Sequence, residues 1–389
     1  MKILHISARY KNLVGGDAIY LDSLVNSQIK LKNKVYIFTA GDKNFELIYK
    51  KKPIRKLSKV PKNFWNLNFQ NSKVSKDLDI CIEEVNPDVI HIHGVHQYFT
   101  LSVLKTLRKF NHIKKIFTVH DYKILCGNAG FMDCNCINKI NSNNIFRGCY
   151  HTSNMKSLAV NMQMSLWYLS DFFNLIDIFH CGSQFVKELI ERNPSIGGKA
   201  VKVRFPYLTE IPKSKKEISY KKEVFFIGRL VEHKGIEIFL RSLCNQKDIK
   251  VRVFGDGPLM PELKNQYSNF QNLHFEGWKT LEQISKVCST GSIVVAPFLA
   301  PETFCYSILE SLSRGNVVVA FKSGAIPELI KNNNGILVEN DEIEIRRAVL
   351  GVMNNPEQRK FIARNAPGIL DEINSSYEHA IEMEKLYKP

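Results

Sequence analysis

The chain has 389 residues, 44% of them hydrophobic, and a formal net charge of +16. This length exceeds what one hydrophobic core comfortably fills and predicts two domains. Apolar runs stay well short of the roughly 18 residues of a transmembrane helix, and the start, MKILHISARY, is too short an apolar run for a signal peptide. The nine cysteines, an odd number in a large chain, favour a reducing compartment. We therefore expect a cytoplasmic protein.

Positive charge is concentrated between residues 43 and 76, where ten basic residues accompany a single acid, Glu46. Interleaved with them are the apolar side chains Phe45, Phe64, Trp65, Leu67 and Phe69. Basic residues with interfacial aromatics fit an anionic membrane surface, at about 1 kcal/mol per nearby cation. Nucleic acid would also attract such a segment. The alternative is a solvated basic face with no partner.

The first half alternates short apolar strands with helical patterns. We expect strands at 2–7, 34–40, 88–93, 116–120 and 177–181, and helices near 17–25, 78–85, 101–108 and 184–192. This alternation predicts a doubly wound parallel sheet whose ligands lie at the carboxyl ends of the strands. The turn Gly15-Gly16 and the side chains of His93 and His120 fall at those ends. A glycine turn between strand and helix can cradle phosphate.

A second alternating series follows a polar, Lys-rich segment. Strands are expected at 224–227, 250–254, 274–276, 292–297, 317–321 and 336–338, with helices at 235–243, 259–267, 281–287, 303–314 and 326–330. We divide the chain into a domain at 1–205, a linker at 206–223, a second domain at 224–365, and helices at 366–389 that pack back on the first domain. The fold class is α/β, with two Rossmann-like doubly wound domains facing each other across a cleft.

Three clusters offer metal-binding alternatives. His91, His93 and His96 include two side chains on one strand face, but no acidic partner follows them, and a buried strand end is favoured. Asp77 and Asp79 precede an amphipathic helix and are interpreted as helix-start charges. The spacing of the cysteines of the Gly- and Asn-rich insert lacks the usual zinc knuckle, so unligated thiols and a structural zinc both stay open for Cys126, Cys134, Cys136 and Cys149.

The stretch at 296–315, APFLAPETFCYSILESLSRG, runs from a strand end into a helix. Thr303 is the predicted N-cap and Gly315 the C-terminal stop. The backbone amides at the helix start, those of Phe304, Cys305 and Tyr306, would bind phosphate or hydroxyl oxygens. The two glutamates of this stretch, Glu302 and Glu310, can accept hydrogen bonds from vicinal hydroxyls, whereas an isolated pair would be ordinary solvated charges.

Two further loops fall at strand ends of the second half. Arg229 and Lys234 flank a loop that leads into a helix; Arg can hold a diphosphate with two hydrogen bonds, and Lys adds a point charge. The loop begins at Gly228, and a second tight turn carries Gly255 and Gly257, where backbone can approach a base or ribose closely. Since these strand ends share one edge of one sheet with the 296–315 stretch, together they predict a nucleotide-sugar site.

The same segments carry a family resemblance. IGRLVEHKGIEIFL, VFGDGP, FEGW, APFLAPETFCYSILESLSRGNVVVA and SGAIPELI resemble the motif series of the retaining, family 4 glycosyltransferases with the GT-B fold. VIHIHG, TVHDYKILC and the Gly-Gly turn match the first half in the same order, so the resemblance spans essentially the whole chain. The cysteine insert resembles one in polysaccharide-assembling members. ETFCYSILE fits the family's E-x7-E motif.

The resemblance implies roles for the second half. Glu302 is expected to contact donor sugar hydroxyls and Glu310 the ribose, while Arg229 and Lys234 neutralise the leaving diphosphate. The family's usual account is front-face attack, in which a donor phosphate oxygen takes the acceptor proton and no metal or carboxylate nucleophile is needed. The nucleotide is expected to be UDP in preference to GDP.

In the first half, the resemblance implies that Gly16 lends its N–H to the distal phosphate and that His120 lies beside the transferring sugar. Three residues depart from the pattern. Thr303 stands where the family has the first Gly of Gly-Phe-Gly. Cys305 stands where the family has the second Gly of Gly-Phe-Gly, which adds bulk near the sugar, and Asp17 places a charge near the expected phosphate.

The sequence therefore predicts a retaining, metal-independent glycosyltransferase that moves a sugar from a nucleotide diphosphate to a glycan acceptor. The basic, aromatic first domain points to a lipid-linked oligosaccharide at the inner face of a bacterial plasma membrane. The expected role is assembly of a surface polysaccharide such as lipopolysaccharide or capsule, with no nucleic-acid partner. The competing hypothesis is a non-enzymatic basic protein that binds nucleic acid or membrane through a nucleotide-binding fold.

Overall fold

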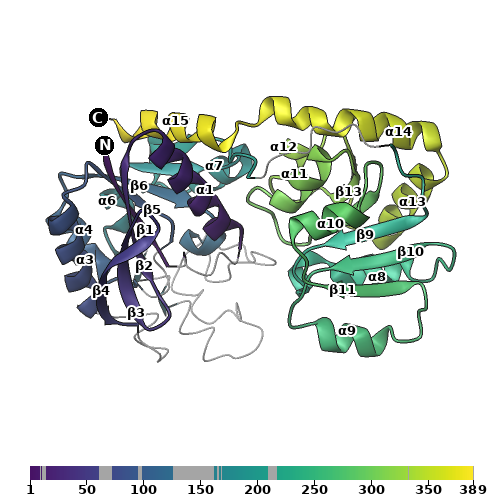
Figure 1. The fold of residues 1–389 in the computed structure, drawn as a ribbon, viewed down its shortest axis with the longest axis horizontal. Helices are drawn as coiled ribbons and strands as arrows, with labels where there is room; N and C mark the ends of the chain where they lie inside the picture. Colours follow the sequence, from purple (N-terminus) through teal and green to yellow (C-terminus); the bar gives the residue numbers. More distant parts are fainter. Residues whose placement is uncertain are drawn as a thin grey trace. The chain divides into compact units, whose positions relative to one another are not determined.

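A computed structural model describes residues 1–8, 10, 15–60, 72–94, 99–125, 162–163, 166–167, 169–208, 217–331 and 333–388. The chain forms two compact units (Figure 1). Unit 1 comprises Met1–Leu208 together with Asn374–Pro389, and unit 2 comprises Thr209–Ile373. Each unit is described below by itself.

Unit 1 is built on an eight-stranded sheet in the order β4-β3-β2-β1-β5-β6-β7-β8. Six of its strands run parallel, and β3 and β4 form an antiparallel hairpin at one edge. Between β1 and β5 the strand order reverses, which defines the topological switch point of the sheet. The strands are β1 (Lys2–Ser7), β2 (Lys34–Ala40), β3 (Asn44–Tyr49), β4 (Lys52–Lys59), β5 (Val89–Ile92), β6 (Lys114–Val119), β7 (Ile178–Cys181) and β8 (Ala200–Lys202).

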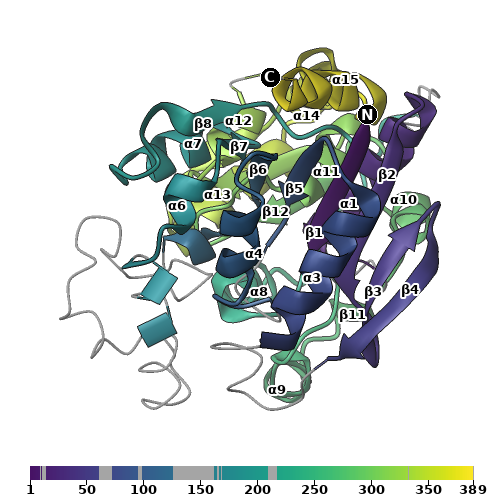
Figure 2. The same ribbon diagram turned by 90° about the vertical axis from the view of Figure 1, so that its left-hand side faces the viewer.

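Helices cover this sheet and bury its apolar strands. Figure 2 shows α3 and α4 over one face, where they pack against each other and α3 contacts β1, β2 and β3. The last helix, α15, packs against α1. The helices of unit 1 are α1 (Gly16–Lys30), α3 (Ser72–Val85), α4 (Val103–Lys109), α6 (Phe172–Leu175), α7 (Gln184–Glu191) and α15 (Ser376–Tyr387), with short 3-10 turns η1 (Tyr122–Ile124) and η4 (Gly197–Lys199).

Unit 2 is built on a six-stranded, fully parallel sheet in the order β11-β10-β9-β12-β13-β14. Its central strands are rich in Val and Phe and almost completely buried, as expected for a sheet covered on both faces. The switch point lies between β9 and β12. The strands are β9 (Glu223–Ile227), β10 (Lys250–Phe254), β11 (Leu273–Gly277), β12 (Ile293–Ala296), β13 (Val317–Phe321) and β14 (Ile336–Val338).

The helices of unit 2 connect these strands and then run beyond the sheet. After β14 the chain remains helical through α13 and α14 before it returns to unit 1 as α15. The helices are α8 (Ile236–Leu243), α9 (Met260–Gln266), α10 (Leu281–Val287), α11 (Tyr306–Ser313), α12 (Ile326–Leu329), α13 (Glu342–Met353) and α14 (Pro356–Asn365), with 3-10 turns η5 (Glu232–Lys234) and η6 (Ala366–Glu372).

The predicted α/β class with two doubly wound parallel sheets is confirmed, and every predicted strand is present within two residues of its expected bounds. The basic segment was assigned no structure, whereas residues 44–59 form the hairpin β3-β4. The short strand β8 was also missed. Among the helices that the structure describes, none combines the length and the apolar character needed to cross a membrane.

Two local predictions in unit 1 were wrong. Asp77 does not start a helix: it lies in the middle of α3, is buried, and accepts a hydrogen bond from the backbone N–H of Ser58 at 3.1 Å. Phe45 is not an interfacial side chain, because it is fully buried and its ring stacks with that of Phe38. The other apolar side chains of the basic segment, from Phe64 to Phe69, lie outside the described residues.

Candidate functional site

The switch point of unit 2 brings two loops together at the carboxyl edge of its sheet. One loop follows β9 and contains Gly228 to Gly235; the other follows β12 and starts at Pro297. The carbonyl of His233 accepts hydrogen bonds from the amides of Leu299 (3.0 Å) and Ala300 (3.2 Å). These backbone bonds fix the two loops to each other, and the side chains that they carry are positioned by that attachment.

Gly235 makes this close approach feasible. Its φ is 65°, in the left-handed region, and a Cβ at this position would lie 1.9 Å from the carbonyl oxygen of Pro297. Only glycine tolerates both the backbone conformation and the contact. Gly235 also serves as the N-cap of α8.

Lys234 and Glu302 meet across these loops. The Lys234 Nζ donates to Glu302 Oε1 at 2.6 Å, and the two side chains are 22% and 15% exposed, respectively. The ammonium also lies 4.4 Å from the centre of the Phe298 ring. Burial alone would lower the pKa of Lys234, but the carboxylate outweighs it, so this pKa lies above its usual value. The ammonium is therefore charged at neutral pH, and its side chain is partly exposed to solvent.

The three predicted glycines after β9 and β10 lie in adjoining turns. The N–H of Gly228 donates to Phe254 O at 3.0 Å. A Cβ at Gly255 would lie 1.8 Å from Gly228 O, and one at Gly257 would lie 2.3 Å from Leu230 O. Each of these close contacts is therefore made with another backbone segment of the protein and not with a ligand. Their contact with a base or ribose remains a prediction.

Arg229 lies between these turns and is exposed. Among the described residues it has no ion-pair partner. The structure thus places Arg229 on the same loop as Lys234, but only Lys234 contacts Glu302.

The start of α11 differs from its prediction. Thr303 is not the N-cap; α11 begins at Tyr306, and Cys305 precedes it with φ 72° and ψ 74°. The amides at the helix start are therefore those of Tyr306 and the two residues after it, instead of Phe304 to Tyr306. Phe304 and Cys305 are buried, and the ring of Phe304 packs edge-on against that of Tyr306 at 5.1 Å. Gly315, with φ 71°, follows the helix as predicted.

Cys305 is a residue other than glycine in the left-handed region, a conformation that costs of order 1–2 kcal/mol for an L-residue. Burial raises the pKa of its thiol to about 12. The thiol is therefore protonated at neutral pH and is not a nucleophile. Its Sγ lies 3.5 Å from the Oγ of Ser307.

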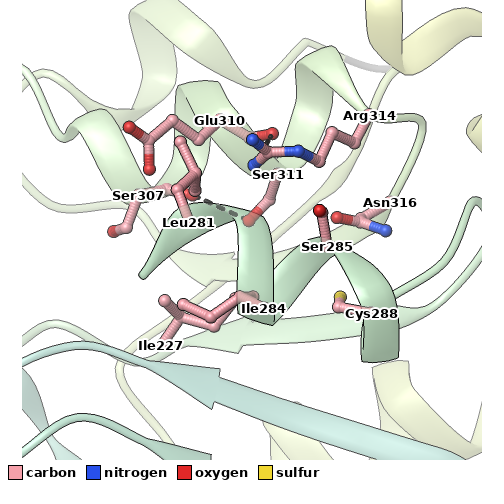
Figure 3. A pocket seen from close by; sticks show the side chains of 10 residues that line it. All are labelled: Ile227, Leu281, Ile284, Ser285, Cys288, Ser307, Glu310, Ser311, Arg314 and Asn316. Carbon is pink, nitrogen blue, oxygen red and sulfur yellow. Dashed lines mark hydrogen bonds between the residues drawn. The ribbon is translucent and has the colours of Figure 1, made fainter. Parts of the chain in front are cut away.

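Glu310 borders a small pocket between α10, α11 and the end of β9 (Figure 3). Figure 3 shows its carboxylate turned away from the Arg314 guanidinium, whose Nη1 donates to the backbone carbonyl of Glu310 at 3.4 Å. Burial raises the pKa of Glu310 to about 7, although the nearby Arg314 opposes this. The pocket is lined by Ile227, Leu281, Ile284, Ser285, Cys288, Ser307, Glu310, Ser311, Arg314 and Asn316.

In unit 1, Gly15 and Gly16 stand at the start of the long helix α1, after β1. Gly15 has φ 109° and is the N-cap, and Gly16 is the first helical residue. Asp17 occupies the first turn, where its negative charge is favourable to the helix dipole. This dipole gives a structural reason for the charge that departs from the family pattern.

His120 follows β6 and is held by aromatic neighbours. Its ring packs edge-on against Tyr20 of α1 at 5.1 Å and tilts against Phe205 at 5.6 Å. Its Nε2 lies 3.2 Å from the Nδ1 of His93, which follows β5. Burial lowers the pKa of His120 to about 4, so this imidazole is neutral at physiological pH.

The structure joins some predicted residues and leaves others separate. It pairs Lys234 with Glu302, while Glu310 borders a different pocket on α11. The cysteine insert, Cys126, Cys134, Cys136 and Cys149, and also His96, lie outside the described residues. The sequence analysis did not identify Phe298, whose ring faces the ammonium of Lys234. It placed Gly235 at the start of a helix but gave it no role in holding the loops together.

Each of the two α/β units carries loops at the carboxyl ends of the strands near its switch point. Comparison with known proteins identifies this architecture as the GT-B fold of glycosyltransferases. HepE of Anabaena, solved with UDP and glucose, superposes with a TM-score of 0.68 at 18% identity, covering 99% of each chain. At this identity the likeness shows the fold alone. An uncharacterized glycosyltransferase of Methanocaldococcus jannaschii is 23% identical over 100% of this chain and 98% of its own length.

The family models divide the chain as the two units do. The model described as Glycosyltransferase Family 4 matches residues 14–202, and the model described as Glycosyl transferases group 1 matches residues 221–355. The O-antigen biosynthesis glycosyltransferase WbnH of Escherichia coli is 24% identical over 77% of this chain and 86% of its own. The chain therefore belongs to the group 1 and family 4 glycosyltransferases.

Proposed function

We propose that this glycosyltransferase is a retaining enzyme that works without a metal ion and takes its sugar from a nucleotide diphosphate. The observation that carries the proposal is the Lys234–Glu302 pair at the carboxyl ends of β9 and β12. Lys234 supplies a fixed positive charge, and Glu302 supplies an acceptor for sugar hydroxyls beside it. Arg229, exposed on the same loop, would add charge toward a diphosphate.

In the proposed reaction the bond between the anomeric carbon and the diphosphate breaks, and the acceptor hydroxyl attacks from the same face. The electron pair of the broken bond stays on the departing nucleoside diphosphate. A phosphate oxygen of that leaving group takes the proton of the acceptor hydroxyl. Lys234, Arg229 and the amides at the N-terminus of α11, all in unit 2, would stabilise the developing negative charge. No carboxylate needs to act as nucleophile.

We further propose UDP as the nucleotide, with its ribose at Glu310. The pocket bordered by Glu310 adjoins the end of β9, the strand whose following loop carries Lys234. An ionised Glu310 would accept hydrogen bonds from both ribose hydroxyls. HepE, a structural neighbour, was solved with UDP, which supports this choice of nucleotide.

A screen of nucleotide sugars tests the proposal directly. UDP- and GDP-linked sugars are incubated with the protein and glycan acceptors, and release of the nucleoside diphosphate is measured with and without EDTA. We expect release from a UDP-sugar that EDTA does not reduce, and an anomeric configuration in the product that matches the donor. Loss of activity in EDTA would contradict metal independence, and an inverted product would contradict the retaining mechanism.

For the acceptor we propose a lipid-linked glycan in surface polysaccharide assembly, in a cytoplasmic protein bound at the inner face of the plasma membrane. The exposed edge strand β4 supports this, because Lys52, Lys56 and Lys59 and the apolar Ile54 (50% exposed) lie along it. WbnH is named for O-antigen biosynthesis. Lysines also protect an edge strand against pairing, so the proposal needs its own test.

Sedimentation with vesicles provides that test. Vesicles with anionic lipid should bind the protein more than neutral vesicles, less so at high salt. Reversing Lys52, Lys56 and Lys59 to Glu should abolish the difference, whereas reversing the exposed Lys264 and Lys286 of unit 2 should not. Equal binding to neutral vesicles would contradict the proposal.

The non-enzymatic hypothesis is distinguished by ligand response. A glycosyltransferase should gain thermal stability from UDP, at about 2.7 kcal/mol when UDP is at a hundred times its Kd. A basic nucleic-acid-binding protein should gain stability from an oligonucleotide instead. Stabilisation by oligonucleotide alone would favour that alternative.

A further inference from the structure

Buried histidines gather in unit 1. Six of the eleven histidines of the chain lie on or beside neighbouring strands and α15, and five of them are almost inaccessible to solvent. All but His379 are linked to one another by hydrogen bonds, directly or through Thr118, Tyr387 and Gln28. The six are His5, His91, His93, His120, His180 and His379.

The direction of these hydrogen bonds is fixed at one end by a carbonyl. His180 Nε2 lies 2.9 Å from the backbone oxygen of Val203, which can only accept, so Nε2 carries the proton. The Nδ1 of the neutral ring must then accept, and it does so from the hydroxyl of Thr118 at 2.9 Å. That hydroxyl has used its single proton. Its oxygen therefore accepts from His91 Nε2 at 2.6 Å.

The same reasoning carries the direction onward through α15 and α1. His91 Nδ1 has to accept, so the hydroxyl of Tyr387 donates to it at 2.8 Å. The oxygen of Tyr387 then accepts from Gln28 Nε2 at 2.8 Å, which turns Gln28 Oε1 toward His5. His5 consequently donates from Nε2 at 2.8 Å and must accept at Nδ1.

The last two links reach the site. His93 Nε2 donates to His5 Nδ1 at 2.9 Å, and His120 Nε2 donates to His93 Nδ1 at 3.2 Å. We propose that this chain of hydrogen bonds sets His120 in its Nε2–H tautomer and leaves Nδ1 as its acceptor nitrogen. Gln28 and Tyr387 are thereby positioning residues for a site that neither contacts.

This assignment of donors and acceptors requires each imidazole ring to be neutral. Burial keeps the rings neutral because it lowers their pKa values. Burial lowers the pKa of His180 to about 3 and that of His5 to about 4. Burial, and to a lesser degree the neighbouring histidines, also hold the pKa values of His91 and His93 well below the usual value. Near neutral pH each ring therefore carries a proton on only one of its two nitrogens. Once the protonated nitrogen of one ring is known, the hydrogen bonds determine which nitrogen is protonated in the next ring.

A metal site is the competing interpretation of this cluster. His5, His91 and His93 offer nitrogens that all lie within 4.8 Å of one another. However, each ring nitrogen of these three residues has a hydrogen-bond partner within the chain described above. A metal ion would have to break several of those bonds in a buried space. We therefore favour the hydrogen-bonded state.

The tautomer has a consequence for ligand choice, and this part rests on the proposed function. A nitrogen that accepts can receive a hydrogen bond from a sugar hydroxyl but not from an ionised phosphate oxygen, which has no proton to give. His120 would thus contact the donor through a hydroxyl of the transferring sugar and not through its diphosphate. It would act as a neutral acceptor and not as a general acid.

Nitrogen-15 NMR of the full chain, with labelled histidine, tests the tautomer without reference to activity. Protonated and unprotonated ring nitrogens have distinct shifts, and the His120 signals are assigned by their loss in His120→Gln. We expect His120 to be protonated at Nε2, and we expect the spectrum to stay unchanged when Zn²⁺ is added. A proton on Nδ1 of His120, or a shift of the His5, His91 and His93 signals with Zn²⁺, would overturn the proposal.

Two matched tyrosine variants test the long-range direction. Tyr387→Phe removes the hydroxyl that links His91 to Gln28. Tyr20→Phe removes a hydroxyl that contacts His379, which belongs to the same histidine cluster but not to the series of hydrogen bonds that leads to His120. Tyr387→Phe should give His120 a mixture of tautomers, and Tyr20→Phe should not. A wild-type pattern in a folded Tyr387→Phe, or an equal change in both variants, would contradict the proposal. Should Tyr387→Phe not fold, the wild-type spectrum still decides.

Turnover separates this inference from the proposed function. In Tyr387→Phe, kcat with the preferred nucleotide sugar should fall on the order of tenfold, the worth of about one hydrogen bond. The affinity for UDP alone should be unchanged, because UDP lacks the sugar. Should the wild type transfer no sugar at all, the proposed function fails while the tautomer result stands. A weakened affinity for UDP in this variant would contradict a sugar-side role.

Discussion

The two units place different chemistry at the carboxyl ends of their parallel strands: Lys234 and Glu302 follow the two strands at the switch point of unit 2, and His120 follows β6, one strand away from the switch point of unit 1. Unit 2 presents an ion pair, Lys234–Glu302, on backbone turns made close by glycine. Unit 1 presents His120, a neutral imidazole backed by other neutral histidines. A charged group favours ionic ligands, whereas a neutral hydrogen-bonding group discriminates by donor and acceptor pattern. Under the proposed function, this difference would suit the Lys234–Glu302 pair to the diphosphate and His120 to a sugar hydroxyl.

The largest effect should come from removing the charge of unit 2. We expect Lys234→Ala to lower kcat about a hundred- to a thousandfold, because in the proposed reaction the departing diphosphate would lose the positive charge of Lys234. Steady-state kinetics with the preferred nucleotide sugar measures this. Lys322→Ala, which breaks the exposed pair with Glu339, is the control and should leave kcat unchanged. Glu302→Gln should also abolish transfer, and near-normal turnover in both site variants would contradict the assignment.

The next effect concerns the backbone that holds the pair together. Gly235→Ala places a methyl group 1.9 Å from Pro297 O, whereas Gly277, at a similar φ of 70°, has open space around it. Gly277→Ala should cost about 1 kcal/mol of unfolding free energy from strain alone. Gly235→Ala should cost about 3 kcal/mol or more, since the loops must also separate. Denaturant unfolding measures both, and equal losses would show that the loop contact is unimportant.

Glu310 gives a pH dependence to unit 2. Its pKa, raised to about 7 by burial, means that the carboxylate is ionised only above that pH. Affinity for UDP should therefore fall as the pH drops through 7, by up to about tenfold, since a charged acceptor binds hydroxyls more strongly than a neutral one. Calorimetric titration at about pH 6 and about pH 8 measures this. In Glu310→Gln the affinity should be low and almost independent of pH over this range.

The stability of the unliganded protein should move in the opposite direction. The pKa of Glu310 in the folded protein lies above the usual value of 4.5, so folding favours the protonated form. The contribution of Glu310 to the free energy of unfolding is full below the pKa of the unfolded state and is lost as the pH rises through about 7. Melting temperatures of wild type relative to Glu310→Gln should thus fall with rising pH. A rise would contradict the burial of this carboxyl.

The smallest effects should come from substitutions of helix N-caps, which test whether the two units unfold separately. Ser375 caps α15 in unit 1, and Thr280 caps α10 in unit 2, each through a capping box. Replacing either by Ala should cost about 1 kcal/mol. If the units unfold separately, Ser375→Ala should lower only the transition of unit 1, and Thr280→Ala only that of unit 2. Calorimetry distinguishes these outcomes, and a common shift in both variants would show a single cooperative transition.

Much of this arrangement could be predicted from local sequence. The parallel strands are continuous apolar runs such as Val317–Phe321, and the loops after them carry the polar residues. Strand ends share a sheet edge, so the approach of Glu302 to the Lys234 loop followed from strand order. The hairpin β3-β4 was missed because its outer strand is an exposed, Lys-rich edge, which lacks the apolar alternation of a half-buried strand.

What could not be predicted depends on long-range contacts or on backbone strain. The bond from His91 to Tyr387 joins residues 296 positions apart, and no local pattern signals it. At α11 the sequence offers Thr303 as a reasonable N-cap, but Cys305 adopts a left-handed conformation and delays the helix to Tyr306. A non-glycine residue in that region is disfavoured locally and is sustained only by its surroundings.

The return of α15 to unit 1 has a consequence for biosynthesis. Gln28 and Tyr20 lie in the first helix, and their partners Tyr387 and His379 lie in the last one, with all of unit 2 between them in the chain. Domains generally begin to fold while the chain is being synthesised, N-terminal part first. Unit 2 can complete its fold as soon as Ile373 has left the ribosome, whereas unit 1 has to wait for residues that are translated after it. Unit 1, whose synthesis begins first, is thus the second of the two units to complete its fold.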